Sequence, residues 1–119
     1  MTQKTIDLTA AFTNNSQNVR VDTSGYDYAI LQIEVPSAQI NFNTSVDAGA
    51  LTGITDGNAL MATNFQPADA LNTATQTYSV SASTSGLFRF NVVGRFLQFV
   101  AAGGTTVGKL LLSLQRSSS

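Results

Sequence analysis

Alternation of apolar and polar residues with a period of two is the feature that most constrains the fold of this chain. In the segment 39–46, Ile40, Phe42 and Val46 share one side with Thr44, while Gln, Asn and Ser residues occupy the other. Successive side chains point to opposite faces in an extended strand, so this segment predicts a strand with one buried face. The same alternation is present in three other segments, 19–22, 88–92 and 110–115.

Short segments of this kind repeat along the chain and are bounded by Gly, Asn, Asp, Ser or Pro, which supply the conformations that end strands. No convincing helix accompanies them, although 67–71 could form a single helical turn. The pattern predicts an all-β fold, an antiparallel β-sandwich of jelly-roll or immunoglobulin-like type with about eight or nine strands. The predicted strands are 4–8, 17–22, 27–35, 38–46, 60–66, 76–82, 87–93, 95–101 and 107–115.

Two turn signals predict how the last strands connect. Gly94 follows one apolar run and precedes another, and glycine supports a tight reversal through positive φ, so we expect 87–93 and 95–101 to form a hairpin. The glycines of 102–106 indicate a second reversal. The last three strands are therefore predicted to form a meander.

The chain has 119 residues, which suits a single domain with one core. We expect residues 1–16 to form an N-terminal arm with the first strand, 17–116 to form the β-sandwich, and 117–119 to be a frayed tail. Two long irregular stretches, 47–59 and 67–75, are expected to contact a neighbouring molecule, together with the arm and the tail. The core is expected to contain four phenylalanines, Phe42, Phe88, Phe90 and Phe99.

Composition restricts the chemistry available to this protein. The chain lacks His, Cys and Trp, and Ser, Thr, Asn and Gln make up 44 of its 119 residues, against 13 charged ones. Most nucleophilic and general-base mechanisms use His or Cys, whose pKa values lie closest to neutrality. We therefore expect a protein that is not an enzyme, has no cofactor and binds through hydrogen-bonding surfaces.

Carboxylates are the remaining candidates for catalysis. Glu34 lies on a predicted strand, Asp22 and Asp27 flank a turn, and Asp47 and Asp56 bracket the glycine-rich loop. A paired-carboxylate hydrolase needs two such groups about 5 to 10 Å apart, one with a raised pKa, and this spacing does not demand it. We interpret the aspartates as turn residues.

Two other segments resemble ligand-binding loops. Asp47, Asp56 and Asn58 could supply oxygen ligands to calcium, but the spacing of an EF-hand loop is absent. The segment 103–106 lacks the Lys-Ser/Thr pair and the following helix of a phosphate-binding loop, so it is interpreted as a turn. No catalytic, cofactor-binding or metal-binding residue is predicted.

Aromatic and outward-facing apolar residues are the candidates for binding. Tyr26, Tyr28 and Tyr78 could stack against a sugar or a base, or could instead cap the sandwich. Tyr28 and Ile30 place apolar area on the polar side of their strand, and Leu111 does so on the last strand. If these residues are neighbours, they form a patch suited to a partner subunit, unless an extra loop covers that face.

Charge and hydropathy restrict the partners. The formal charge is −1, with no basic stripe, so we expect no nucleic-acid partner. The longest apolar stretch, 96–102, is far shorter than the ~18 to 20 residues that span a bilayer, so no membrane partner is expected. The first eight residues lack the apolar region of a signal peptide, which favours assembly in a cytoplasm.

The order of these segments resembles that of small virion proteins of tailed bacteriophages. The similarity begins with Ser24-Gly25, the apolar strand 28–35, and the strand 40–46 running into Asp47-Ala48-Gly49, where Ala48 interrupts the Ser-x-Asp-Gly loop of the group. It continues through 78–80, 86–99 and 103–110, which are similar to the closing strands of the same group.

This resemblance implies a head decoration (cement) protein or a related small tail component, a β-sandwich that often forms trimers on an assembled shell. The implied partners are the major capsid protein or another virion protein and further copies of this chain, a trimer being favoured. The implied location is the virion, after assembly in the host cytoplasm. The alternatives from the residues are a carbohydrate-binding or adhesion module of a phage tail or baseplate, and a small hydrolase using Asp or Glu.

Overall fold

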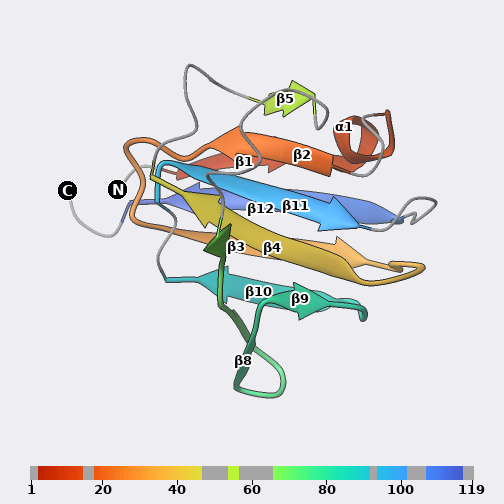
Figure 1. The fold of residues 1–119 in the computed structure, drawn as a ribbon. Helices are drawn as coiled ribbons and strands as arrows, with labels where there is room; N and C mark the ends of the chain where they lie inside the picture. The colour runs from red at the N-terminus through yellow and green to blue at the C-terminus, as the bar shows by residue number, and fades with distance from the viewer. Residues whose placement is uncertain are drawn as a thin grey trace.

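The computed structural model describes residues 3–14, 18–46, 54–56, 66–91, 94–101 and 107–116, which form two stacked antiparallel sheets (Figure 1). Sheet A has six strands in the order β1 (Gln3–Asp7), β12 (Lys109–Gln115), β3 (Tyr28–Glu34), β10 (Gly86–Phe90), β7 (Ala70–Asn72) and β8 (Thr77–Ser79). Sheet B has β5 (Ile54–Asp56), β2 (Asn18–Asp22), β11 (Phe96–Ala101), β4 (Ile40–Ser45) and β6 (Gln66–Pro67), with β9 (Ser81–Ala82) also paired with β4. The predicted all-β antiparallel sandwich is confirmed.

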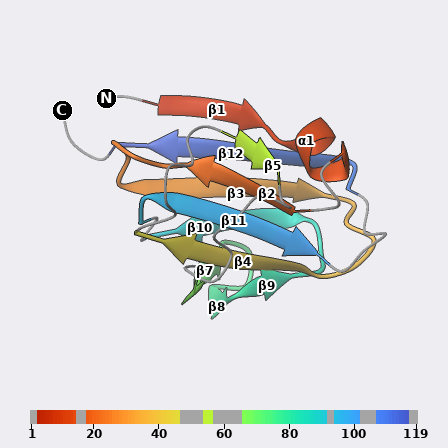
Figure 2. The same ribbon diagram turned by 45° about the horizontal axis from the view of Figure 1, so that its top comes forward.

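Strand pairing is nested from the ends of the chain inward. β1 pairs with β12, β2 with β11, β3 with β10 and β4 with β9, all antiparallel. The long strands therefore alternate between the sheets along the chain, and Figure 2 shows the strands of one sheet overlapping those of the other. This nesting is jelly-roll topology, which decides between the two predicted types of sandwich.

The predicted hairpin of 87–93 with 95–101, and the meander that included it, are wrong. β10 lies in sheet A and β11 in sheet B, and β12 returns to sheet A. Gly94 has the expected positive φ, of 56°, but it serves a crossing between the sheets. Reversal at a glycine does not specify the next partner strand, and here both flanking strands pair with strands from the first half of the chain.

Two further segments differ from the prediction, and a third lies almost wholly outside the described residues. The predicted strand 76–82 divides into β8 and β9, which belong to different sheets, because the Ser79 hydroxyl bonds the backbone of Ser81 and the chain bends at Val80. The predicted irregular stretches contain β5, β6 and β7, so a helical turn at 67–71 is also wrong. The predicted strand 60–66 lies outside the described residues except for Gln66 in β6.

A short helix, α1 (Thr9–Asn14), corrects the expectation that no helix is present. The Asp7 carboxylate accepts a hydrogen bond from the backbone N–H of Thr9 at 3.0 Å, which caps the helix and lowers the pKa of Asp7. Leu8 and Phe12 are fully buried. Six residues are too few to show a helical period, so the sequence pattern missed α1. In the described part of the chain, no helix has the length and apolar character needed to cross a bilayer.

The N-terminal arm packs on the sandwich itself. β1 extends sheet A by pairing with β12, and the backbone N–H of Leu8 donates to the Leu110 carbonyl at 2.7 Å. Its predicted contacts with another subunit stay a prediction. The tail 117–119 lies outside the described residues.

The core between the sheets contains the four predicted phenylalanines. The Phe42 ring from sheet B lies 5.8 Å from that of Phe88 and 5.1 Å from that of Phe90, both of sheet A, and 6.0 Å from that of Phe99. Val46 is an exception to the predicted inner face, since it is 81% exposed. β4 ends at Ser45, so Val46 lies beyond the layer between the sheets.

The outer face of sheet B is also covered at its centre. Arg20, Phe96 and Gln98 point away from the core by strand alternation, yet they are 1%, 0% and 3% exposed. The Gln98 side-chain oxygen accepts a hydrogen bond from the Asn43 amide at 3.0 Å. β2 and β11 are therefore buried on both faces, which leaves the outer face of sheet A as the more accessible broad surface.

Candidate binding surface

The outer face of sheet A brings together the outward apolar residues that the sequence singled out. Ser113 lies opposite Ile30 and Leu111 lies opposite Gln32, so Ile30 and Leu111 are diagonal neighbours on adjacent strands. Tyr28, Ile30 and Leu111 are all half-buried. The register therefore meets the condition stated from the sequence, that these three residues be neighbours on one face.

Strand pairing adds three apolar side chains to this surface. Leu87 on β10 lies opposite Gln32, Leu71 on β7 lies beside Arg89, and Tyr78 on β8 lies opposite Leu71. Leu87 is 44% exposed and Tyr78 is 59% exposed. The sequence did not indicate Leu71 and Leu87, because only the strand order places them beside the predicted patch. Together, these apolar side chains form the outer patch: Tyr28, Ile30, Leu71, Tyr78, Leu87 and Leu111.

Polar groups link Tyr28 and Tyr78 within the outer patch. The Arg89 guanidinium lies 4.1 Å from the centre of the Tyr28 ring, and its Nε donates to the Asn91 side-chain oxygen at 2.8 Å. The Asn91 amide in turn donates to the Tyr78 hydroxyl at 3.1 Å. These contacts connect β3, β10 and β8 and orient the exposed Tyr78 ring.

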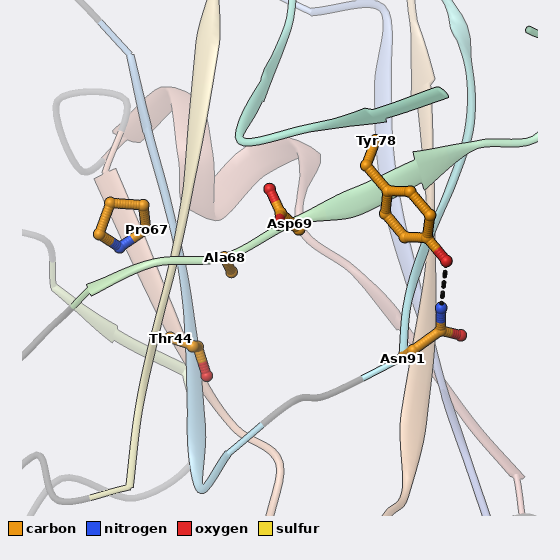
Figure 3. Close-up of a pocket in the computed structure, with 6 residues that line it drawn as sticks. All are labelled: Thr44, Pro67, Ala68, Asp69, Tyr78 and Asn91. Atoms are coloured by element: carbon orange, nitrogen blue, oxygen red, sulfur yellow. Dashed lines mark hydrogen bonds between the residues drawn. The ribbon is translucent and has the colours of Figure 1, made fainter. Parts of the chain in front are cut away.

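A pocket of about 510 Å³ lies beside Tyr78, where the chain crosses from β6 in sheet B to β7 in sheet A. Figure 3 shows Tyr78 and Asn91 on one side of the pocket and Pro67 on the other, with the crossing chain between them. Its lining consists of Thr44, Pro67, Ala68, Asp69, Tyr78 and Asn91. The lining combines the aromatic ring of Tyr78, the apolar side chains of Pro67 and Ala68, and several hydrogen-bonding groups.

The three predicted aromatic candidates occupy different environments. Tyr26 is half-buried and packs against the core, and Tyr28 lies beneath Arg89. Tyr78 alone of the three lines the pocket of about 510 Å³. A stacking role is therefore best supported for Tyr78.

The described carboxylates that the sequence singled out are held apart or engaged locally. Asp27 immediately precedes β3 and Glu34 ends it, which separates them by about 23 Å along an extended strand. Glu34 accepts a hydrogen bond from Gln32. This separation exceeds the span of a catalytic carboxylate pair.

Asp22 forms a turn with Ser24. Burial alone would raise the pKa of Asp22, but hydrogen bonds from the Ser24 hydroxyl and backbone N–H, at 2.6 and 2.9 Å, together with the charges of Arg95 and Lys4, lower it. A lowered pKa suits a turn-forming carboxylate and opposes a role as general acid.

The remaining candidates fall on other parts of the chain. Asp47, Asn58 and the segment 103–106 lie outside the described residues, and only the backbone of Asp56 is described, in β5. Among the residues that the structure describes, no group of three or more acidic side chains is placed to hold a metal ion.

Comparison with known proteins gives a structural neighbour. No protein-family model matches the chain. No curated protein matches it either. The crystal structure of the SPBc2 prophage-derived protein YomS is similar, with a TM-score of 0.63 and 10% sequence identity over 95% of this chain and 91% of that chain. At this identity the likeness shows a shared fold.

Proposed function

We propose that this protein is a non-enzymatic structural protein of a tailed-phage virion that binds and stabilises the outside of the assembled capsid, as a head decoration (cement) protein does. Its partners are the major capsid protein and further copies of the same chain, a trimer being favoured. The assembled particle is then its location.

The outer patch is the observation that carries this proposal. Its six apolar side chains lie on one face of a six-stranded sheet and are interspersed with uncharged Gln32 and Ser113 and with the charged Arg89. Apolar area with a polar surround is typical of protein contact surfaces. A repeating shell offers many equivalent sites, so a modest contact per subunit suffices for stable attachment.

The structural neighbour supports the same class of protein. Its name describes it as prophage-derived, and it shares the fold over nearly the full length of both chains. Jelly rolls are frequent in viral capsid proteins and in lectins. Because one fold serves many functions, the shared fold supports the proposal only by analogy. The argument for a contact surface on this protein comes from the outer patch.

Sedimentation with phage heads that lack the protein tests the proposal. We expect purified protein to pellet with undecorated heads and to raise the temperature at which those heads disrupt. Protein that stays wholly in the supernatant at every concentration would contradict the proposed function. The mass of the free protein in solution tests the oligomeric state, for which we expect a trimer.

Matched variants test the surface. Leu111→Asp places a charge inside the outer patch, and Val46→Asp places one on an 81% exposed residue beyond the end of β4. We expect Leu111→Asp to lose head binding or self-association and Val46→Asp to retain both, with both variants folded by circular dichroism. Unchanged behaviour of Leu111→Asp would remove the outer patch from the contact surface.

A carbohydrate-binding or adhesion module of a phage tail or baseplate is the second candidate, and the pocket beside Tyr78 favours it. The same sedimentation experiment separates the two candidates when tails and heads are purified apart. Pelleting with tails alone would favour the adhesion module.

A further inference from the structure

The pocket beside Tyr78 is built at a junction of the two sheets. Pro67 belongs to β6 of sheet B, and three residues later the chain enters β7 of sheet A. The backbone N–H of Ala68 donates to the Phe42 carbonyl at 2.9 Å, and Ala68 is 4% exposed, so this crossing is anchored to the core. The floor of the pocket is therefore attached to the core, and a site that is held in place before binding loses less entropy when a ligand binds.

One wall of the pocket is an exposed aromatic ring. Tyr78 is 59% exposed, although its ring carries enough apolar area to favour burial. The Asn91 amide donates to its hydroxyl, and Arg89 donates to Asn91, so the ring is held by a chain of hydrogen bonds. The accepting hydroxyl keeps its own hydrogen available for donation to a ligand.

The pocket also contains a hydrogen-bond acceptor, the carboxylate of Asp69. Asp69 lines the pocket and is exposed, and in the described part of the chain its carboxylate makes no hydrogen bond or ion pair. An ionised carboxylate accepts hydrogen bonds only and makes strong ones. Asp69 can therefore accept from neighbouring hydroxyl groups without breaking any contact within the fold.

These groups define the chemistry of the ligand. Among the described residues of the lining there is one negative charge and no cation, which disfavours phosphates, nucleic acids and other anions. A flat apolar ring beside acceptor and donor groups matches a pyranose, whose C–H face is apolar and whose edge carries hydroxyls. The volume of about 510 Å³ lies within the range of small-molecule sites.

We propose that this pocket binds a neutral saccharide, with Tyr78 stacking on the sugar ring and Asp69 and Asn91 bonding its hydroxyls. This proposal deepens the second candidate function, the carbohydrate-binding module, and does not rest on the proposed capsid role, since a protein on a head or a tail could present the site equally. Asp69 lines the pocket but is not part of the outer patch. Head binding by Asp69→Asn at the level of the unmodified protein, together with weakened saccharide binding, therefore keeps the two proposals separate.

Saturation-transfer NMR on the full chain tests the site. The probes are the methyl glycosides of glucose, galactose, mannose, N-acetylglucosamine and rhamnose, with N-acetylneuraminic acid and inorganic phosphate as anionic probes. We expect at least one neutral glycoside to receive saturation and to shift the Tyr78 ring resonances. Saturation of no neutral glycoside, or binding of the anionic probes alone, would overturn the proposal.

Variants assign the binding to the pocket. We expect Tyr78→Ala to weaken the best glycoside on the order of tenfold, because stacking and a hydroxyl donor are lost together. Asp69→Asn is expected to weaken it several-fold while leaving the unfolding midpoint unchanged. Leu87→Ala, on the outer patch but away from the pocket, is the matched control and should bind as the unmodified protein does. Full binding by Tyr78→Ala would place the sugar elsewhere and contradict the assignment.

Discussion

Phe42 on β4 and Phe90 on β10 meet nearly edge to face across the two sheets, with ring centroids 5.1 Å apart and an interplanar angle of 79°. Both rings are fully buried, and Phe42 also contacts Phe88 and Phe99. Phe90 and Phe99 also meet across the sheets, with ring centroids 5.9 Å apart, and Phe42 contacts all three of the other rings in this cluster.

Replacement of Phe42 should be among the most destabilising single changes. We expect Phe42→Ala to lower the free energy of unfolding by about 3 to 5 kcal/mol, because it removes buried area and leaves a cavity. Phe42→Leu should cost less, since more of the volume is retained. Urea denaturation measures both, with Leu87→Ala as an exposed control. A loss for Phe42→Ala no larger than for the control would contradict the central position of Phe42.

Replacement of Gly94 and of Gly25 by alanine should destabilise the protein by different amounts. Both positions have positive φ, but only Gly94 also has a backbone atom too close for a Cβ. A Cβ at Gly94 would lie 2.8 Å from the Ser45 carbonyl oxygen, whereas the nearest atom to one at Gly25 is the end of Arg116 at 3.5 Å. We expect Gly25→Ala to cost about 1 kcal/mol from φ alone, and Gly94→Ala about 2 to 4 kcal/mol. Thermal unfolding of both variants measures the difference, and equal losses would show that the contact with Ser45 is relieved at no cost.

Val35 offers a stabilising change. It has a φ of 54°, which is unfavourable for a β-branched residue, and its side chain is 73% exposed. Val35→Gly should therefore raise the free energy of unfolding by about 0.5 to 1 kcal/mol, after the greater backbone entropy of glycine is included. Val35→Ala keeps the unfavourable φ and serves as the control. A lower melting temperature for Val35→Gly than for Val35→Ala would refute the prediction.

Phe12 tests the attachment of the N-terminal arm. Its ring is fully buried while Thr13, the next residue of α1, is exposed. We expect Phe12→Ala to destabilise the protein by about 3 to 5 kcal/mol and Thr13→Ala to change stability by about 0.5 kcal/mol or less. Denaturant midpoints distinguish the two results. Similar small effects would indicate that the arm contributes little to the core.

Asp22 should make stability depend on pH. Its pKa is lower in the folded protein than the value of about 3.9 in an unfolded chain, so its contribution is present above pH ~4 and is lost as the pH falls through the folded pKa. Asp22→Asn should therefore be less stable than the unmodified protein at pH 6, with a gap that narrows toward pH 2. Thermal melts across this range measure the gap.

Ser24→Ala is the companion variant for Asp22. It removes the hydroxyl that donates to the carboxylate and keeps the backbone donor. At pH 6 the stability of Ser24→Ala should therefore lie between that of the unmodified protein and that of Asp22→Asn. A gap for Asp22→Asn that is constant with pH would show that the charge of Asp22 is not what stabilises the turn.

Local pattern was enough for some elements of the fold and insufficient for others. The strands that became β2, β3 and β12 alternate clearly, because each has one face on the core. The helix α1 and the short strands β5, β6 and β7 contain six residues or fewer, which is too little for a period to be recognised. The break at Val80 depends on a local Ser79 hydrogen bond that alternation does not reveal.

The candidate site was only partly predictable for a related reason. Tyr78 was a candidate for stacking, but its partners Asn91 and Asp69 lie 13 and 9 residues away in the sequence and meet it only through the folding of β7, β8 and β10. Ile30 and Leu111 were each assigned from the sequence to the outward side of their own strand. Their adjacency required the register between β3 and β12.

By itself, the order of residues determined that this chain forms an antiparallel β-sandwich with Phe42, Phe88, Phe90 and Phe99 inside, because side-chain direction in a strand follows from spacing alone. Only the tertiary structure decided that strands pair in nested order, that Gly94 carries the chain between sheets, and that Tyr78 borders a pocket. Pairing between distant strands depends on the free energy of the whole core, and no local segment contains that information.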